Sequence, residues 1–450
     1  MTGRPSQIQT LAVWMNGERV GEWQFSPRSG HAFRYDPQWL VNPLRRSLSL
    51  SLPLEQGTQP FSGPLVEYFF DNLLPDSVEI RKRLSHKFGS GTRTFELLQQ
   101  IGRDCVGAVQ LLPQDAESPN VRRIEAQPVT DAQVERILDQ AVTEPVPGIA
   151  EDQEFRISIA GAQEKTALLW HRNRWCKPLG ATPTTHIFKL PLGEVGGMRA
   201  DFTTSVENEW LCAELAREFG LPVAECQIAA FGRYKVLIVK RFDRRLIEGK
   251  WWARLPQEDF CQVNGLPSEM KYEDKGGPGM RNILGILRGS DTAEIDRQQF
   301  LSTQVLFWLL AAPDGHAKNF SLFLEVAGRY RLTPLYDIMS AWPIIGDGAR
   351  QIQWKKVKLA MAVRSQSAHY KMSTIQRRYW SEVAKANGVG ENFEPVIQRF
   401  IAQAPSVIAA VARRLPKGFP QVVSDRIFEG VLGQVRRLDQ QGKISAQSGS

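Results

Sequence analysis

Three oxygen-bearing side chains lie close together in the stretch APDGHAKNFSLFLEVAGRYRLTPLYD, residues 312–337. Asn319 follows Asp314 by five positions, and Asp337 comes after two short apolar segments that we expect to be strands. Mg²⁺ takes hard oxygen ligands, and one or two carboxylates with phosphate and water form its usual protein site. We therefore expect Asn319 and Asp337 to bind Mg²⁺, and Asp314 to orient the hydroxyl of a substrate.

The spacing of these residues is that of a kinase catalytic loop followed by its metal-binding Asp. Phosphoryl transfer also requires a lysine on the phosphates and backbone amides that cradle them. Lys189 in THIFKLP is the candidate lysine, and Gly161 in SIAGAQEKTALL marks the candidate loop. Taken alone, Gly161 could belong to an ordinary hairpin turn, and Lys189 could point to solvent. Glu207 or Glu209 of the following helix could pair with Lys189.

A strand that leads out of the first lobe could offer backbone groups to an adenine base. LIVKRFDRR supplies Lys240, Arg241 and Phe242 as this hinge, although a buried strand that ends in charge fits equally well. His316 and Lys318 lie inside the candidate catalytic loop, where they could touch phosphate. One histidine and one lysine do not make a zinc site.

Composition sets broad limits on the protein. A chain of 450 residues is expected to form two or three domains. With 42% hydrophobic and 23% charged residues, it resembles an ordinary soluble globular protein. No run of about 18 apolar residues predicts a transmembrane helix, and the N-terminus lacks a signal-peptide core. The five scattered cysteines indicate reduced thiols and a cytoplasmic location.

The charge is mildly positive, at +8 with a pI of about 9.2. This bias suits phosphate-bearing partners, and it also suits simple solubility. The pattern predicts an α+β protein with three parts: a β-rich subdomain over residues 1–148, a strand-rich kinase-like N-lobe over 149–262, and a helical C-terminal lobe over 263–450.

Local patterns predict several elements. Asn16-Gly17 favours a two-residue hairpin turn. SLSLSLPL, FRISIAG, TALLW, THIFKLPL, VAECQIAAF and YKVLIVKRF are expected strands. PLVEYFFDNLLPDSVEIRKRL is expected to be helical with an interruption at Pro75. Further helices are expected from Ser205 as N-cap to Gly220, over DRQQFLSTQVLFWLLAAPDG to near Pro313, and over two C-terminal stretches, EPVIQRFIAQAPSVIAAVARRL and VVSDRIFEGVLGQVRRLDQ.

Long motifs in order along the chain resemble the HipA-type serine/threonine kinase toxins of bacteria. They are FFDNLLPDS, IGRDCVGAVQLLP, RISIAGAQEKTALL, TPTTHIFKLP, RLPQEDFCQ, KYEDKGGPG, PDGHAKNF and LTPLYDI, and they cover nearly the whole chain. The resemblance implies a bilobal protein-kinase-like fold related to phosphoinositide kinases. It adds an extra N-terminal β-rich subdomain, and the C-terminal lobe is expected to be all-α.

The resemblance also implies roles for individual residues. It makes Asp314 catalytic, and it makes Asn319 and Asp337 metal ligands. The implied autophosphorylated residue is Ser158, whose phosphate would repel ATP from the neighbouring loop. The implied ATP-binding residues are Ala160, Gly161, Ala162, Gln163, Glu164, Lys165, Lys189, Lys240, Arg241, Phe242, His316, Ala317, Lys318, Asn319, Tyr336 and Asp337. The family often has Glu where Lys240 stands, so only a backbone contact to adenine would survive there.

Partners follow from the same resemblance. We expect a small helix-turn-helix antitoxin of the HipB type that binds operator DNA as a dimer, with glutamyl-tRNA synthetase as the phosphorylated protein. Lys385, Arg377 and Arg378 are candidate DNA contacts, although a solvated helix face is the simpler reading, and Gly388 stands where the family has Arg. Two other functions stay open: a small-molecule or lipid kinase, and a non-catalytic corepressor that only binds DNA.

Overall fold

The computed structural model describes residues 8–143, 158–161, 163–196 and 199–448. They form two compact units that both draw on distant parts of the chain. Unit 1 comprises Met1–Leu190, Ala229–Met270 and Ser321–Tyr330. Unit 2 comprises Pro191–Ile228, Lys271–Phe320 and Arg331–Ser450.

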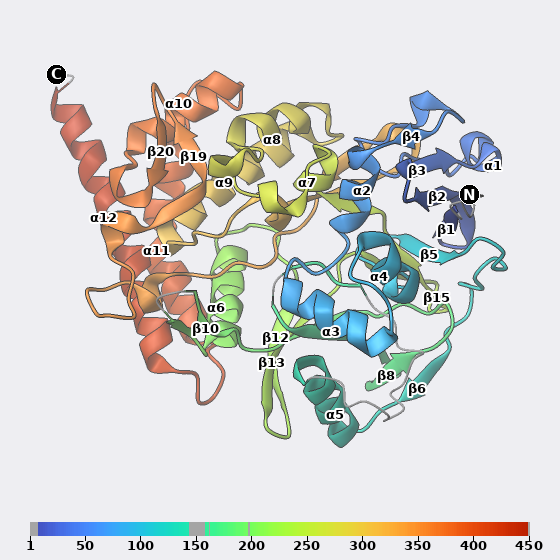
Figure 1. Cartoon of the computed structure of the whole chain (residues 1–450). Helices are drawn as coiled ribbons and strands as arrows, with labels where there is room; N and C mark the ends of the chain where they lie inside the picture. Colours follow the sequence, from blue (N-terminus) through green and yellow to red (C-terminus); the bar gives the residue numbers. More distant parts are fainter. Residues whose placement is uncertain (1–7, 144–157, 162, 197–198, 449–450) are drawn as a thin grey trace. The chain divides into compact units, whose positions relative to one another are not determined.

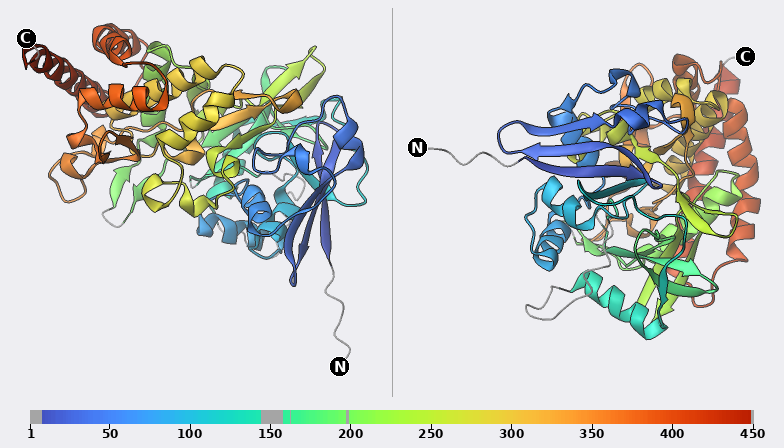
Figure 2. Two further views of the ribbon diagram at one scale, coloured as in Figure 1. Left: turned by 90° about the horizontal axis from the view of Figure 1, so that it is seen from above. Right: turned by 90° about the vertical axis from the view of Figure 1, so that its right-hand side faces the viewer.

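Unit 1 opens with a five-stranded antiparallel sheet in the order β4-β3-β2-β1-β5, drawn in blue to cyan in Figure 1 and seen from two other sides in Figure 2. The expected turn at Asn16-Gly17 is confirmed, because both residues have positive φ and join β1 to β2. The bounds are β1 Gln9–Met15, β2 Glu18–Ser26, β3 Gly30–Tyr35, β4 Phe61–Ser62 and β5 Val109–Pro113, with helices α1 Pro37–Val41, α2 Pro64–Asp71, α3 Val78–Phe88 and α4 Thr94–Ile101. The expected break at Pro75 falls between α2 and α3.

A six-stranded sheet in the order β12-β13-β9-β7-β8-β6 follows. Helix α5 (Asp131–Val142) packs against one face of this sheet, where its Val134 and Leu138 share a core with Leu168 and Phe188. Successive side chains of a strand point to opposite faces, so Lys189, next to Phe188, belongs to the face away from α5. The strands are β6 Ala126–Pro128, β7 Lys165–His171, β8 Arg174–Pro178, β9 His186–Lys189, β12 Cys226–Phe231 and β13 Tyr234–Lys240.

Short elements complete the described part of unit 1. The hairpin of β14 (Arg244–Ile247) and β15 (Trp251–Arg254) comes directly after the hinge segment. Strand β16 (Gln257–Asp259) leads into α7 (Phe260–Val263) and pairs with β17 (Ser321–Leu324). Strands β17 and β18 (Tyr330–Leu332) are the two that the sequence predicts between Asn319 and Asp337.

Unit 2 is mainly helical. Its longest buried element is α9 (Ala293–Leu310), which ends close to where the sequence predicts. The other elements are α6 Ser205–Glu218, α8 Met280–Ile286, α10 Arg377–Asn387, α11 Glu394–Ala412 and α12 Gln421–Ser448, and the strands β10 Gly193–Val195, β11 Ala200–Phe202, β19 Lys358–Arg364 and β20 Ala368–Lys371. The antiparallel pair β19–β20 corrects the expectation of an all-α lobe.

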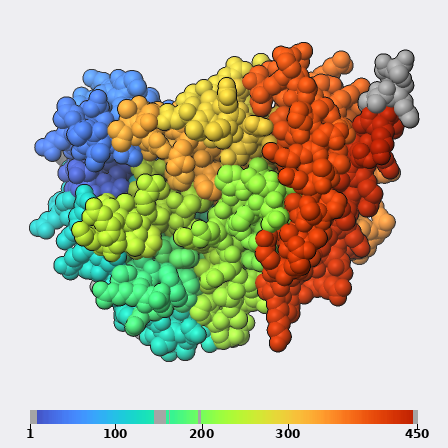
Figure 3. Space-filling model, turned by 180° about the vertical axis from the view of Figure 1, so that it is seen from behind, coloured from blue at the N-terminus to red at the C-terminus, as the bar shows by residue number. Residues whose placement is uncertain are grey.

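Helix α11 packs against α6 and α12, and Figure 3 shows the side chains of α11 and α12 in orange and red along one face. By length and composition α11 could cross a membrane, with a mean hydropathy of 1.2 over 18 residues. A single core helix passes the same test, so α11 is weak evidence for a membrane span.

Two strand predictions differ from the structure. SLSLSLPL forms only an isolated bridge between Ser49 and Leu52. Side chains replace the strand ladder there, because the Tyr35 hydroxyl accepts from the Leu48 amide and the Ser49 hydroxyl accepts from the Ser51 amide. FRISIAG lies partly outside the described residues, and its described part, 158–161, contains no strand.

Candidate active site

The loop that carries Asp314 begins where α9 ends. Ala311 caps α9 in the left-handed conformation, with φ of 48°, and turns the chain back along the helix. A Cβ atom at Gly315 would lie 2.3 Å from the ring of Phe307, so only glycine allows the loop to pass this close to α9. The His316 amide donates to the Asp314 carbonyl at 2.8 Å and closes a tight turn. The Asp314 side chain stays 49% exposed, accessible to a substrate.

Tyr272 and His316 surround the Asp314 carboxylate. The Tyr272 hydroxyl donates to Asp314 Oδ1, and His316 Nε2 lies 3.8 Å from the same oxygen. The rings of Tyr272 and His316 meet edge to face, with centroids 5.0 Å apart. Our sequence reasoning did not assign Tyr272 a role, although it belongs to KYEDKGGPG. This arrangement fixes the direction of a carboxylate that could accept a hydrogen bond from a hydroxyl.

Asn319 and Asp337 form the candidate metal site. Asn319 Nδ2 donates to Asp337 Oδ2 at 3.4 Å, which brings the two predicted ligands together. Asn319 Oδ1 is buried, and it has no hydrogen-bond partner among the described residues. An orphaned buried acceptor is costly, whereas an amide oxygen beside a carboxylate suits Mg²⁺. The two residues therefore fit this metal.

The backbone of Asp337 supports the same interpretation. Its φ of 61° lies in the left-handed region, which residues other than glycine rarely adopt. Leu335, two residues before Asp337, is held on both sides, because the Leu335 amide donates to the Pro222 carbonyl and the Leu335 carbonyl accepts from the Ala224 amide, each at 2.8 Å. Strained conformations of this kind persist where the surroundings impose them, and they are frequent at functional sites.

The other predicted contacts of this loop are inside unit 2. Ala317 and Lys318 belong to the 3-10 helix Ala317–Asn319 and are buried, as is His316. The Tyr336 hydroxyl donates to the Lys318 carbonyl at 2.9 Å. Tyr336 thereby joins the segment before Asp337 to the segment before Asn319.

Unit 1 holds the candidate phosphate-binding lysines. Lys189 of β9 is directly opposite Lys165 of β7 in the antiparallel register. Like charges in this position destabilise a sheet, so the pair favours a site for an anion. Lys189 is only 7% exposed, and Lys165 Nζ donates to the carbonyl of Ala160. The contact with Ala160 places the Lys165 ammonium group beside the predicted phosphate segment.

The phosphate segment is tied to its surroundings at several points. Gly161 has φ of 107°, and its carbonyl accepts from the Asp76 amide at 3.1 Å. Gln163 Nε2 donates to the Leu190 carbonyl at 2.5 Å, and the Leu190 amide donates to the Glu164 carbonyl at 3.1 Å. Ala162 lies outside the described residues.

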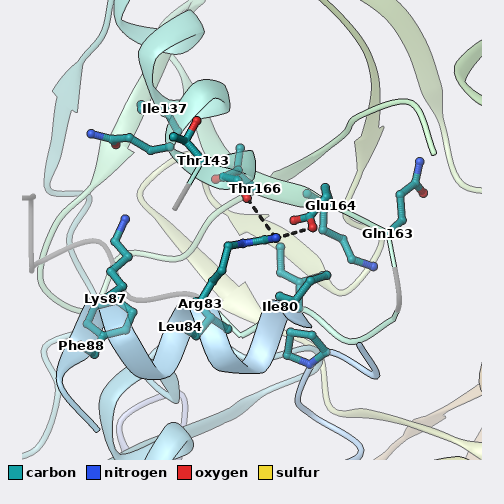
Figure 4. Close-up of a pocket in the computed structure, with 15 residues that line it drawn as sticks. Ile80, Arg83, Leu84, Lys87, Phe88, Ile137, Thr143, Gln163, Glu164 and Thr166 are labelled. Atoms are coloured by element: carbon teal, nitrogen blue, oxygen red, sulfur yellow. Dashed lines mark hydrogen bonds and ion pairs between the residues drawn. The ribbon is translucent and has the colours of Figure 1, made fainter. Parts of the chain in front are cut away.

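A pocket adjoins this segment between α3 and α5. Figure 4 shows Arg83 of α3 reaching Glu164, with which it forms an ion pair. Thr166 also lines the pocket. Thr166 is opposite Phe188 in the register and so belongs to the α5 face. Lys189 belongs to the other face of the sheet. The pocket therefore adjoins the phosphate segment on the face opposite Lys189.

Ser158 is fully buried. Its hydroxyl donates to the Leu73 carbonyl at 2.7 Å, and its amide donates to the Asp104 carbonyl at 3.2 Å. The hydroxyl oxygen of Ser158, which would attack the phosphate, is inside unit 1. A kinase could therefore reach it only after the residues around Ser158 move out of the unit.

The predicted hinge stays a prediction. The side chain of Arg241 is buried among Asp104, Asp243 and Thr184, and its amide donates to the Thr185 carbonyl at 2.9 Å. Lys240 is exposed at the end of β13, and the ring of Phe242 packs edge-on against Phe323.

The candidate DNA contacts are not equivalent. Arg377 is buried and forms an ion pair with Glu394, so the structure does not support a contact from Arg377 to DNA. Arg378 and Lys385 are exposed on α10, with side chains 69% and 68% accessible. Gly388 is the C-cap residue of α10 and has a φ of 64°, a left-handed conformation that favours glycine. The geometry of the cap therefore explains why glycine occupies this position.

Lys189 belongs to unit 1, whereas Asp314, Asn319 and Asp337 belong to unit 2. Glu207 and Glu209 are both buried in α6, also in unit 2. A pairing of either glutamate with Lys189 therefore stays a prediction.

Comparisons with known proteins agree on one family. A family model for the HipA-like C-terminal domain matches residues 157–408, and one for the HipA N-terminal domain matches residues 11–112. A putative kinase of Sinorhizobium fredii, Y4mE, is 32% identical over 416 residues, which cover 91% of this chain and 92% of that protein. The serine/threonine-protein kinase toxin HipA of Shewanella oneidensis is 30% identical over 347 residues, which cover 74% of this chain and 75% of that protein.

The fold agrees as well. A solved HipA of Shewanella oneidensis MR-1, in a complex with HipB and its operator DNA, aligns with a TM-score of 0.75 over 95% of this chain and 97% of that one. At 23% identity this match shows a shared mixed α/β fold and nothing more specific. Together with the two family models and the relatives, it establishes that the chain belongs to the HipA family.

Proposed function

We propose that this protein is an ATP- and Mg²⁺-dependent serine/threonine protein kinase, with a bilobal protein-kinase-like fold related to phosphoinositide kinases. The observation that carries the proposal is the pair of oxygen ligands in unit 2. Asn319 Oδ1 is buried without a hydrogen-bond partner among the described residues, and it lies in the same side-chain pair as the Asp337 carboxylate. The names of two relatives as kinases support the same activity.

Each group of candidate residues has a distinct task in this proposal. Lys189 and Lys165 neutralise phosphate oxygens, since both ammonium groups belong to the face of the sheet away from α5. Asn319 and Asp337 would hold Mg²⁺, and the chemistry that the metal would supply is neutralisation of phosphate charge. Asp314 accepts a hydrogen bond from the hydroxyl of the protein substrate and orients its oxygen for attack. The Tyr272 hydroxyl and His316 keep that carboxylate in place.

Nucleotide recognition would rest on the backbone of the hinge. The Arg241 side chain and amide are already engaged within unit 1. We assign the backbone of Lys240 and Phe242 to the adenine base. A substitution of Lys240 should therefore affect ATP binding little.

Self-inactivation through Ser158 is part of the proposal. A phosphate on Ser158 cannot occupy the buried position of the hydroxyl, because a dianion there would lose its solvation next to the Leu73 carbonyl. Phosphorylation would therefore keep the segment before Ala160 displaced. The nearby negative charge would also oppose binding of ATP phosphates.

The relatives suggest the biological setting. We propose a cytoplasmic toxin that pairs with a HipB-like antitoxin dimer and, through it, with operator DNA as a corepressor. The Shewanella oneidensis complex of HipA, HipB and operator DNA supports these partners. Glutamyl-tRNA synthetase is the proposed substrate, and its phosphorylation would arrest growth and promote persistence. Arg378 and Lys385 remain candidate DNA contacts.

A labelled-phosphate assay tests the activity. The purified chain is incubated with γ-labelled ATP and Mg²⁺, alone and with glutamyl-tRNA synthetase, and EDTA serves as the control. We expect label on Ser158 and on a serine or threonine of the synthetase, and none with EDTA. Label on a lipid or small molecule but not on protein would replace the proposal with a different kinase. ATP binding without any transfer would favour a corepressor that lacks catalysis.

A further inference from the structure

Five charged side chains form a buried cluster in unit 1 around the hinge segment. Asp104 comes from the end of the N-terminal region, and the others come from the hinge and the hairpin that follows it. None of the five residues is more than 6% exposed. The cluster consists of Asp104, Arg241, Asp243, Arg244 and Arg254.

The Asp104 carboxylate is the centre of this cluster. Its Oδ2 accepts from the amide and the hydroxyl of Thr184, at 2.9 and 2.7 Å, and from Arg241 at 3.4 Å. Its Oδ1 accepts from Arg244 at 3.0 Å and from Arg254 at 3.2 Å. One carboxylate therefore contacts all three guanidinium groups and also Thr184, two residues before β9.

The backbone next to Asp104 joins the same cluster. The Cys105 carbonyl accepts from Arg241 at 2.8 Å and from Arg244 at 2.9 Å. The Gly107 amide donates to Asp243 at 2.7 Å. Gly107 has φ of 73°, and a Cβ atom there would lie 2.8 Å from the Gln257 carbonyl, so the chain can pass here only as glycine. Residues 104–107 thus hold Arg241 of the hinge and Asp243, which directly follows the hinge.

The charges of the cluster do not cancel. Three guanidinium groups face two carboxylates, so the buried group carries a net charge of one positive unit. Burial raises the pKa of Asp104, but Arg244, Arg241 and Arg254 outweigh burial and hold that pKa well below its usual range. Asp104 stays ionised, and its removal would leave three cations with one counter-charge. Buried ionic groups of this kind add little to the free energy of unfolding, because the cost of desolvation offsets the attraction between the charges. They are better suited to fixing one geometry.

Asp104 also contacts the other wall of the candidate nucleotide site. Its carbonyl accepts from the Ser158 amide at 3.2 Å, two residues before the phosphate segment begins at Ala160. The carboxylate holds the hinge, and the carbonyl of the same residue holds the approach to the phosphate segment. Because the carboxylate and the carbonyl belong to the same residue, only a few covalent bonds separate the contact with the hinge from the contact with Ser158.

We propose that Asp104 is a positioning residue for nucleotide binding, which sets the hinge and the phosphate segment of unit 1 at a fixed separation. The proposal rests on the kinase function proposed above. Asp104 lies within residues 11–112, which match the HipA N-terminal domain, whereas Arg241 and Ser158 lie within the HipA-like C-terminal domain. The N-terminal domain would then complete the nucleotide site of the other domain.

Two variants of the full-length chain test this role. Asp104→Asn keeps the shape and removes the charge, and Thr184→Val removes one hydroxyl that donates to Asp104 and accepts from Arg241. Thr184→Val is the milder change, and it keeps the test valid if Asp104→Asn does not fold. Glu258→Gln is the control for a buried carboxyl elsewhere in unit 1, and among the described residues the Glu258 carboxyl accepts from Ser49 and Leu50. Burial raises the pKa of Glu258 to about 8, so this control replaces a buried acid that is largely uncharged at neutral pH.

The readouts are KM for ATP and kcat for phosphorylation of the synthetase, with the thermal midpoint of each variant as a check on folding. We expect KM for ATP to rise about tenfold or more in Asp104→Asn and by a smaller factor in Thr184→Val, with kcat at saturating ATP changed much less. Glu258→Gln should leave both constants near those of the wild type.

Three outcomes are decisive. An unchanged KM in a folded Asp104→Asn protein, or an unchanged KM in Thr184→Val where Asp104→Asn does not fold, overturns the positioning role. Equal increases in KM for ATP in Asp104→Asn and Glu258→Gln would show that the loss of any buried carboxyl has this effect. This result also overturns the positioning role of Asp104. A wild-type chain that neither binds ATP nor transfers phosphate refutes the kinase function itself, which is a different result.

Discussion

Asp314→Asn is expected to lower kcat by about 10²–10⁴-fold, the range that positioned general bases contribute. The amide keeps the shape of the side chain, and it can still accept from the Tyr272 hydroxyl through its oxygen. It cannot carry the charge that orients a substrate hydroxyl and receives its proton. KM for ATP should change little, because Asp314 is assigned to the substrate hydroxyl. Initial rates over a range of ATP concentrations check both expectations.

A control of similar exposure is available in the same unit. Asp439 of α12 is 41% exposed and pairs with Lys443, away from the candidate loop in sequence and in its contacts. Asp439→Asn should retain wild-type rates. A folded Asp314→Asn protein with a kcat equal to that of Asp439→Asn would remove Asp314 from catalysis.

Asp337→Asn is expected to weaken Mg²⁺-dependent binding of ATP by at least about a hundredfold, since even residues that only support metal ligands contribute 10–100-fold. Asparagine is one of the residues that tolerate a left-handed backbone, so the φ of 61° at this position can be kept. The loss can therefore be assigned to the carboxylate. Calorimetric titration of ATP at several Mg²⁺ concentrations measures it.

The matched control for this variant is Asp347→Asn, an exposed carboxylate of the same unit. It removes the same charge without touching the Asn319–Asp337 pair. If ATP binding by Asp337→Asn depends on Mg²⁺ as strongly as it does in the wild type, residues other than Asp337 hold the metal.

The sequence predicted local elements well wherever side-chain periodicity and turn residues agreed. The Asn16-Gly17 hairpin, the break at Pro75 and the end of α9 before Pro313 all follow from local chemistry. The pairing of Asn319 with Asp337 was also within reach, because only two short strands separate them.

Other features depend on contacts that no local pattern reveals. SLSLSLPL alternates as a strand would, but hydrogen bonds from its backbone amides to the hydroxyls of Tyr35 and Ser49 hold it in a turn. Arg241 was a predicted hinge contact. Its side chain is buried against Asp104, which is far away in the sequence, so no local pattern could predict this burial. Tyr272 was not assigned a role for the same reason, since its hydroxyl meets Asp314 only in the folded unit.

The central claim is that Asn319 and Asp337 hold the metal of a bound nucleotide whose phosphates contact Lys189. A crystal structure of the full chain with Mg²⁺ and a non-hydrolysable ATP analogue tests it most directly. The account predicts a metal about 2.1 Å from Asn319 Oδ1 and from an Asp337 oxygen, with Lys189 Nζ within hydrogen-bond distance of a phosphate oxygen. A bound nucleotide whose metal contacts neither Asn319 nor Asp337 would contradict it.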